Sequence, residues 1–234
     1  MWVKRFSVSV LAIFGLLTAG AGAAEVSRAN RLLFLSDQLA PLGRQTTLYY
    51  ELRSHGGEDG QSFTDRIVMR LKAPQSGSGW DASFDYLSGE RRRYVPPENN
   101  VLGNPIIKIF LQRQVVEMQR HTGGSWRYFQ KAVKRALADS GTVAPASFEF
   151  QGKKVRGTRI AIEPYQGDPS RERIGDYASV RYVFLLSEKV PGMVYRMKAV
   201  LPRAASSEVG DDPPRGETLT LQRVEETDHR TRGE

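Results

Sequence analysis

The sequence predicts an α+β fold: a curved antiparallel sheet or incomplete β-barrel, with a helical hairpin between its two strand groups and a short N-terminal helix. Three observations lead to this prediction. Apolar and polar residues alternate in several segments before and after the middle of the chain, as in strands with one buried face. Residues 104–139 show helical spacing instead. Residues 26–40 carry leucines at helical spacing ahead of Pro41.

The alternating segments fall into two groups separated by the helical region. The first group comprises Thr47–Arg53, Phe63–Lys72 and Trp80–Leu87, with Glu90–Val95 as a candidate fourth strand that Pro96 and Pro97 would end. In the second group, the last strand is expected at an edge of the sheet because a polar stretch precedes it. The candidates in that group are Ser147–Gln151, Val155–Glu163, Val180–Ser187, Met193–Leu201 and Glu217–Val224.

The helical hairpin has recognisable start and stop signals. Asn104 and Pro105 suit an N-cap and the first helical position. Gly123 and Gly124 break the helical pattern, and Ser125 is expected to cap a second helix that ends near Asp139. The first helix is apolar around much of its circumference. It is expected either as part of the core or as a plug over an apolar cavity.

The second helix of the hairpin combines an apolar stripe with a basic one. The basic stripe consists of Arg127, Lys131, Lys134 and Arg135. One interpretation is a helix packed on the sheet with a solvated basic back. The alternative is contact with an anionic surface, such as a membrane or an envelope protein. Arg91–Arg93 and Lys153, Lys154 and Arg156 are interpreted as charges that protect strand edges from aggregation.

Residues 1–23 have the three parts of a cleavable secretory signal peptide. Lys4 and Arg5 precede an apolar run, and small residues follow it. The run is shorter than the roughly 20 apolar residues that span a bilayer. We therefore expect a periplasmic protein without a lipid anchor, since the chain has no cysteine. Residues 24–202 are expected to form one domain, and 203–234 a loop, a candidate edge strand and a disordered tail.

The composition assigns no catalytic residue, metal site or cofactor. Without cysteine there is no thiol nucleophile, zinc–thiolate site or iron–sulfur cluster. His55, His121 and His229 have no partner at metal-ligand spacing. A hydrolase is a third hypothesis, with no residues assigned to it. The net charge of +8 favours anionic partners, and export argues against nucleic acid among them.

The order of elements resembles the half-barrel of periplasmic lipoprotein carriers of the LolA and LolB type. The resemblance is architectural and covers most of residues 26–201. It implies an incomplete antiparallel barrel that holds acyl chains under a helical lid. The buried strand faces and the first helix would then line an apolar cavity. Its candidate residues are Leu48, Tyr50, Phe63, Ile67, Phe84, Tyr86, Ile107, Phe110, Leu111, Tyr182 and Phe184.

Two functional hypotheses follow from these features. The first is a periplasmic protein that binds or carries a hydrophobic, lipid-like envelope component in the half-barrel. The second is an envelope assembly or protein-interaction factor that uses the basic hairpin as its contact surface, without catalysis. An empty apolar cavity under the sheet would favour the first hypothesis, and an interior filled by side chains would favour the second.

Overall fold

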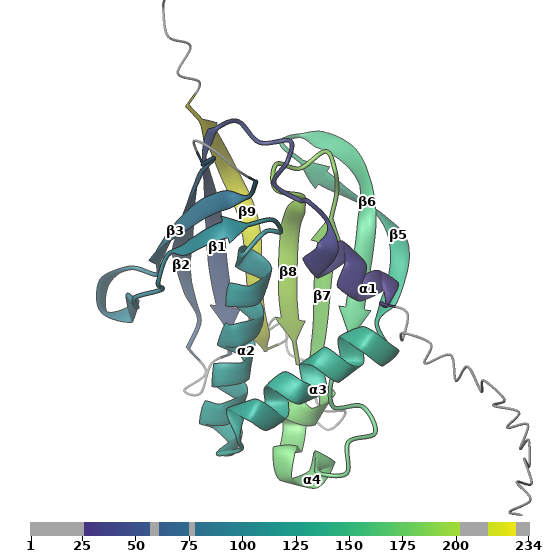
Figure 1. The fold of residues 1–234 in the computed structure, drawn as a ribbon. Coiled ribbons are helices and arrows are strands. Elements are labelled where there is room, and N and C mark those ends of the chain that lie inside the picture. The colour runs from purple at the N-terminus through teal and green to yellow at the C-terminus, as the bar shows by residue number, and fades with distance from the viewer. Residues whose placement is uncertain (1–25, 57–60, 75–77, 202–214, 228–234) are drawn as a thin grey trace, which may run out of the picture.

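The predicted fold class is confirmed by the computed structural model, which describes residues 26–56, 61–74, 78–201 and 215–227. Nine antiparallel strands form one curved, open sheet in the order β4-β3-β2-β1-β9-β8-β7-β6-β5. Helices cover one face of this sheet (Figure 1). The candidate signal peptide lies outside the described residues, as do residues 202–214 and 228–234.

The first strand group follows the alternating segments closely. It contains β1 (Gln45–His55), β2 (Phe63–Lys72) and β3 (Trp80–Tyr86). The fourth strand was predicted wrongly: β4 is Glu98–Val101, after the two prolines. Leu87 and Gly89 both have positive φ, which turns the chain out of the strand direction and leaves Tyr86 and Arg93 as an isolated bridge.

The second strand group ends in the middle of the sheet. It contains β5 (Thr142–Phe150), β6 (Lys153–Ile162), β7 (Arg181–Leu186), β8 (Val194–Val200) and β9 (Gly216–Glu226). The expected edge position of the last strand is wrong, because β9 pairs with both β1 and β8. This central position buries Leu219 and Leu221. The edge strand is instead β5, which accommodates Pro145.

The helical hairpin connects β4 to β5 and packs in front of the sheet. Its helices are α2 (Ile106–Thr122) and α3 (Trp126–Asp139). Gly123 has φ +68° and ends α2 with a left-handed residue. Two short elements, α4 (Arg171–Ile174) and η3 (Gly175–Ser179), precede β7. In Figure 1 these elements lie below α3, at the end of the sheet where β1 finishes.

The N-terminal helix is shorter and more irregular than its leucine spacing suggests. It consists of α1 (Arg28–Asn30) and a π-helical turn, η1 (Arg31–Leu35). Leu33 is buried, but Leu35 is 64% exposed. Leu35 lies two residues after Leu33, and residues at this spacing point to different sides of a helix, so Leu35 does not share the face on which Leu33 packs.

The core fills the concave side of the sheet. Ile107 and Phe110 of α2 are at most 1% exposed, as are Leu48 and Tyr50 of β1. The rings of Phe110 and Phe184 meet edge to face at 6.3 Å. Side chains therefore occupy the middle of the half-barrel. Within the described residues, no helix has the length and apolar character needed to cross a membrane.

Candidate ligand-binding cleft

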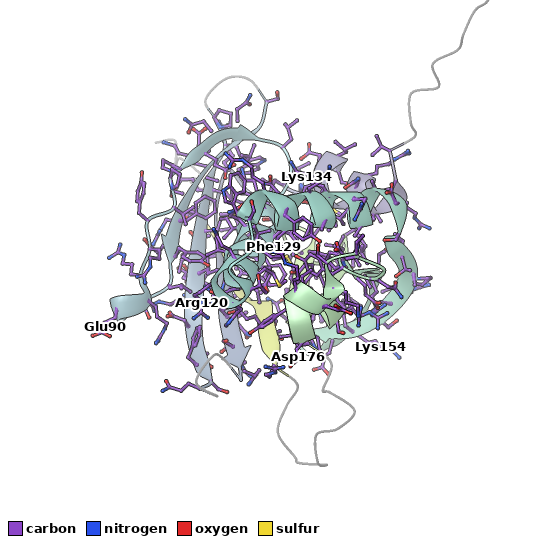
Figure 2. All side chains as sticks on the ribbon, turned by 90° about the horizontal axis from the view of Figure 1, so that it is seen from below. Glu90, Arg120, Phe129, Lys134, Lys154 and Asp176 are labelled. Carbon is purple, nitrogen blue, oxygen red and sulfur yellow. The ribbon has the colours of Figure 1, made fainter. Side chains whose placement is uncertain are left out.

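A cleft of about 680 Å³ lies at the end of the half-barrel where β1 ends and β9 begins. The C-terminal half of α2 forms one wall, and the strand ends and η3 form the other. Figure 2 views the molecule from this end, with Arg120 marking α2 and Asp176 marking η3. The volume is in the range of small-molecule sites.

The cleft has apolar walls on both sides of α2. Phe63, Val95, Ile109 and Val116 contribute on the side of β2 and of the segment after β3. On the side of β7 and β8, the apolar lining residues are Met118, Val180, Tyr182, Ala199 and Leu201. An apolar portion of a ligand would be shielded from water between these walls.

Arginines stand at the rim next to the first apolar wall. The Arg93 guanidinium donates to the carbonyl oxygens of Glu90 and Arg92, at 2.9 and 2.8 Å. Among the described residues, no carboxylate pairs with it. Arg91 lies 4.8 Å above the Phe63 ring, but its Nε donates to Asp65 at 2.9 Å. Arg93 is therefore the rim cation whose charge is left for a ligand.

Asp65 fixes the segment that carries these arginines. Its carboxylate accepts hydrogen bonds from the Ser88 hydroxyl at 2.7 Å, the Arg66 N–H at 2.8 Å and Arg91. Burial alone would raise the pKa of Asp65, but these donors hold it below its usual value. The side chain is only 1% exposed. Asp65 thus remains a carboxylate and holds residues 88–91 against β2.

A buried ion pair closes the floor of the cleft between α2 and β9. The Glu217 carboxylate accepts from Arg113 Nε at 2.8 Å, from Arg113 Nη2 at 2.5 Å and from Gln114 Nε2 at 2.7 Å. Burial opposes the charge of Arg113, but the bonds to Glu217 raise its pKa overall. Because Glu217 compensates the charge of Arg113, this arginine stabilises the fold and is less available to a ligand than Arg93.

His121 lies at the mouth of the cleft without forming a catalytic pair. Its ring stacks on Tyr177 at 4.7 Å, and Nε2 lies 3.4 Å from Glu117 Oε2. In the part of the chain that the structure describes, no serine hydroxyl is hydrogen-bonded to His121. A nucleophile next to a base is the minimum for a hydrolase of the serine type. The hydrolase hypothesis therefore gains no residues from this arrangement.

The structure brings only some of the predicted cavity residues to the cleft. Phe63, Tyr86 and Tyr182 line it. Leu111 is buried and Phe84 is half-buried, both outside the cleft. The remaining six are packed in the core with at most 1% exposure, which favours the core alternative for the first helix over the plug. They are Leu48, Tyr50, Ile67, Ile107, Phe110 and Phe184.

Several cleft residues were not selected from the sequence. His55, Arg93, His121 and Glu217 come from four separate segments, and only the folded sheet brings them together. The Arg91–Arg93 run was visible, but we interpreted it as edge protection. Its turn geometry, which directs Arg93 toward the cleft and leaves Arg92 outside it, has no signal in the sequence.

The four basic residues predicted on the second helix form a separate surface. Arg127, Lys131, Lys134 and Arg135 are exposed on the side of α3 that faces away from the sheet. The Arg127 guanidinium lies 4.6 Å from the Trp126 ring centroid. Among the described residues, none of the four forms an ion pair with a carboxylate. These residues lie outside the cleft.

Comparisons with known proteins give no match, so the function is inferred from the chemistry of the cleft. No protein-family model matches this chain, and no curated protein matches it either. In the described part of the chain, no group of histidine, aspartate and glutamate side chains is placed to hold a metal ion. The cleft is thus defined by apolar walls, a rim cation and a compensated buried ion pair.

Proposed function

We propose that the protein binds an amphipathic, anionic, lipid-like molecule in the cleft between α2 and the strand ends. The observation that carries this proposal is the position of Arg93 beside an apolar wall, as a cation that has no carboxylate partner among the described residues. The acidic group of the ligand would pair with Arg93, and its apolar part would lie along Ile109 and Val116. Exposure to envelope lipids would follow from the export expected for residues 1–23.

The charge of the cleft favours an anion over a neutral lipid. Its lining contains four arginines but only two glutamates, Glu117 and Glu217. Glu217 is compensated by Arg113, and Glu117 lies 2.8 Å from Arg120. An arginine can bind a carboxylate or a phosphate through two parallel hydrogen bonds. The apolar walls would contribute about 0.8 kcal/mol for each methylene that they bury.

A carrier role agrees with the location of the cleft and with the architecture. The cleft opens at one end of a curved sheet, so a ligand would enter without crossing the packed core. The half-barrel shape resembles the LolA and LolB type of carrier, but the ligand would lie at the end of the barrel. Its acidic group would stay at the rim, where water and a partner can reach it.

A fatty-acid titration tests the cationic part of this proposal. Dansyl-undecanoic acid should bind the protein with increased fluorescence, and Arg93→Glu should weaken binding at least tenfold. A charge-assisted hydrogen bond contributes about 1.5–3 kcal/mol, and the new carboxylate adds repulsion. Arg92→Glu is the matched control, because the Arg92 side chain is 71% exposed and lies outside the cleft. Absence of binding, or equal losses in both variants, would refute the proposal.

A second pair of variants tests the apolar wall. Val116 is 47% exposed and lines the cleft, whereas Leu102 is 55% exposed outside it. Val116→Glu should reduce affinity for the dansyl fatty acid about tenfold, because it places a carboxylate against an apolar chain. Leu102→Glu should leave affinity within about twofold, since an exposed substitution changes little. Native mass spectrometry should find lipid in the unmodified protein and less lipid in Val116→Glu.

A further inference from the structure

The outward side of the helical layer carries a cationic surface that continues from α3 onto α1. Arg127, Lys131, Lys134 and Arg135 are exposed along α3. Ser27 joins the two helices, because its hydroxyl donates to the Leu137 carbonyl oxygen at 2.7 Å. The exposed Arg28 therefore lies, in space, near the C-terminal end of α3. Figure 2 shows Lys134 on the side of α3 that points away from the sheet.

An exposed apolar patch lies at the end of η1, the continuation of α1. Phe34 is 41% exposed, Leu35 64% and Leu102 55%. Leu102 lies close to the other two, since a Cβ on Gly103 would be 3.8 Å from the carbonyl oxygens of Phe34 and Ser36. The six exposed large apolar side chains among the described residues include all three. Clustered exposed apolar side chains are typical of an interaction site.

We propose that this face docks on the surface of an anionic lipid bilayer. The basic residues of α3 and Arg28 would bind lipid phosphates, and Phe34, Leu35 and Leu102 would enter the headgroup layer. Cations beside exposed leucine and phenylalanine are the combination that interfacial helices present to membranes. The apolar patch lines neither the cleft nor the pocket beside β6 and the β7–β8 turn. An anchoring side chain of a partner protein would need a pocket in this patch. A lipid surface needs none, because it adapts to the shape of the protein, and it therefore suits the patch better.

This inference does not depend on the ligand of the cleft. None of the residues that would contact the bilayer lines the cleft. Arg93→Glu should therefore leave membrane binding unchanged, and removal of the α3 cations should leave binding of the dansyl fatty acid unchanged. The two proposals can fail separately.

Vesicle sedimentation of the full chain from residue 24 tests the docking. The protein should sediment with equimolar phosphatidylcholine and phosphatidylglycerol vesicles but not with phosphatidylcholine alone, and salt should weaken binding. Lys131→Glu/Lys134→Glu/Arg135→Glu should lower the partition coefficient at least about 100-fold, at about fivefold for each cation. Leu35→Ser, at the most exposed apolar position of the patch, should lower it about tenfold.

A second triple variant controls for net charge. Lys153→Glu/Lys154→Glu/Lys189→Glu makes the same change in charge at exposed positions of β6 and the β7–β8 turn, and Lys154 lies away from Lys134 in Figure 2. This variant should keep most of the vesicle binding, and thermal unfolding should show that all variants fold. Equal losses in both triple variants, or no effect of Leu35→Ser, would overturn the proposal. Binding to soluble polyglutamate without vesicle binding would overturn it too, and would assign the surface to an acidic macromolecule.

Discussion

Replacing Arg113 by methionine would leave the Glu217 carboxylate buried, with Gln114 as its one remaining side-chain donor among the described residues. The side chains of Arg113 and Glu217 are only 15% and 9% exposed, so water compensates little of the lost charge. Arg113 donates two of the three hydrogen bonds from α2 to the β9 carboxylate, and Gln114 donates the third. Breaking a buried pair from one side costs about 3–5 kcal/mol.

The double variant separates the cost of an orphaned charge from the value of the pair. Replacing both partners by apolar residues of similar size is often neutral, so Arg113→Met/Glu217→Met should lose less than about 1 kcal/mol. The single variant should lower the unfolding free energy by about 3 kcal/mol. In a chain of this size that corresponds to a fall in Tm of about 6–12 °C. The coupling energy between the two positions should exceed about 2 kcal/mol.

Urea unfolding at pH 7, followed by circular dichroism, measures the unfolding free energies of the unmodified protein, of Arg113→Met, of Glu217→Met and of the double variant, and these four values give the coupling energy. Arg120→Met is the control on the same helix, because Arg120 also bonds a glutamate but its side chain is 48% exposed. It should cost less than about 1 kcal/mol. A loss below about 1 kcal/mol for Arg113→Met, or additive losses in the double variant, would refute the role assigned to this pair.

Two further predictions concern the supports of the cleft and of the sheet. Asp65→Asn should lower the unfolding free energy by about 1–3 kcal/mol at neutral pH. The folded-state pKa of Asp65 is lowered, so its contribution is complete above the unfolded pKa of about 4 and is lost as pH falls through the folded value. A difference between the two proteins that does not shrink as the pH falls below the unfolded pKa would contradict this. Gly157→Ala should cost more than about 2 kcal/mol, because its Cβ would lie 2.2 Å from the Leu186 carbonyl oxygen. Gly152→Ala meets nothing within 4 Å and should cost only about 1–2 kcal/mol for its positive φ, as thermal unfolding would show.

Local periodicity was sufficient to predict most elements of the fold. The bounds of β2 are the predicted ones because exposed and buried side chains alternate over most of Phe63–Lys72, with Val68 as a buried exception. The start of α2 follows from Asn104, whose Oδ1 accepts a hydrogen bond from the Ile106 N–H at 3.1 Å. Such signals act over a few residues, and a single sequence contains them in full.

Features that depend on pairing between segments far apart in the chain could not be predicted from local sequence patterns. The central position of β9 arises from ladders with β1 and β8, and its separation from β8 along the chain suggested an edge. The cleft likewise joins the end of β1, the middle of the chain and the start of β9, and no local signal predicts their proximity.

The composition of α2 explains why the cleft lies at one end of the half-barrel and not at its centre. The first half of the helix carries Ile106, Ile107 and Phe110, which are at most 1% exposed and fill the concave face. The rest of the helix carries Arg113 and Arg120, whose charged groups need partners and water. An apolar helix face packs against the sheet without voids, whereas Arg113 reaches β9 through the end of a long side chain, at Glu217. The change from apolar to charged residues along one helix thus places a solvated cleft with apolar walls where the charges begin.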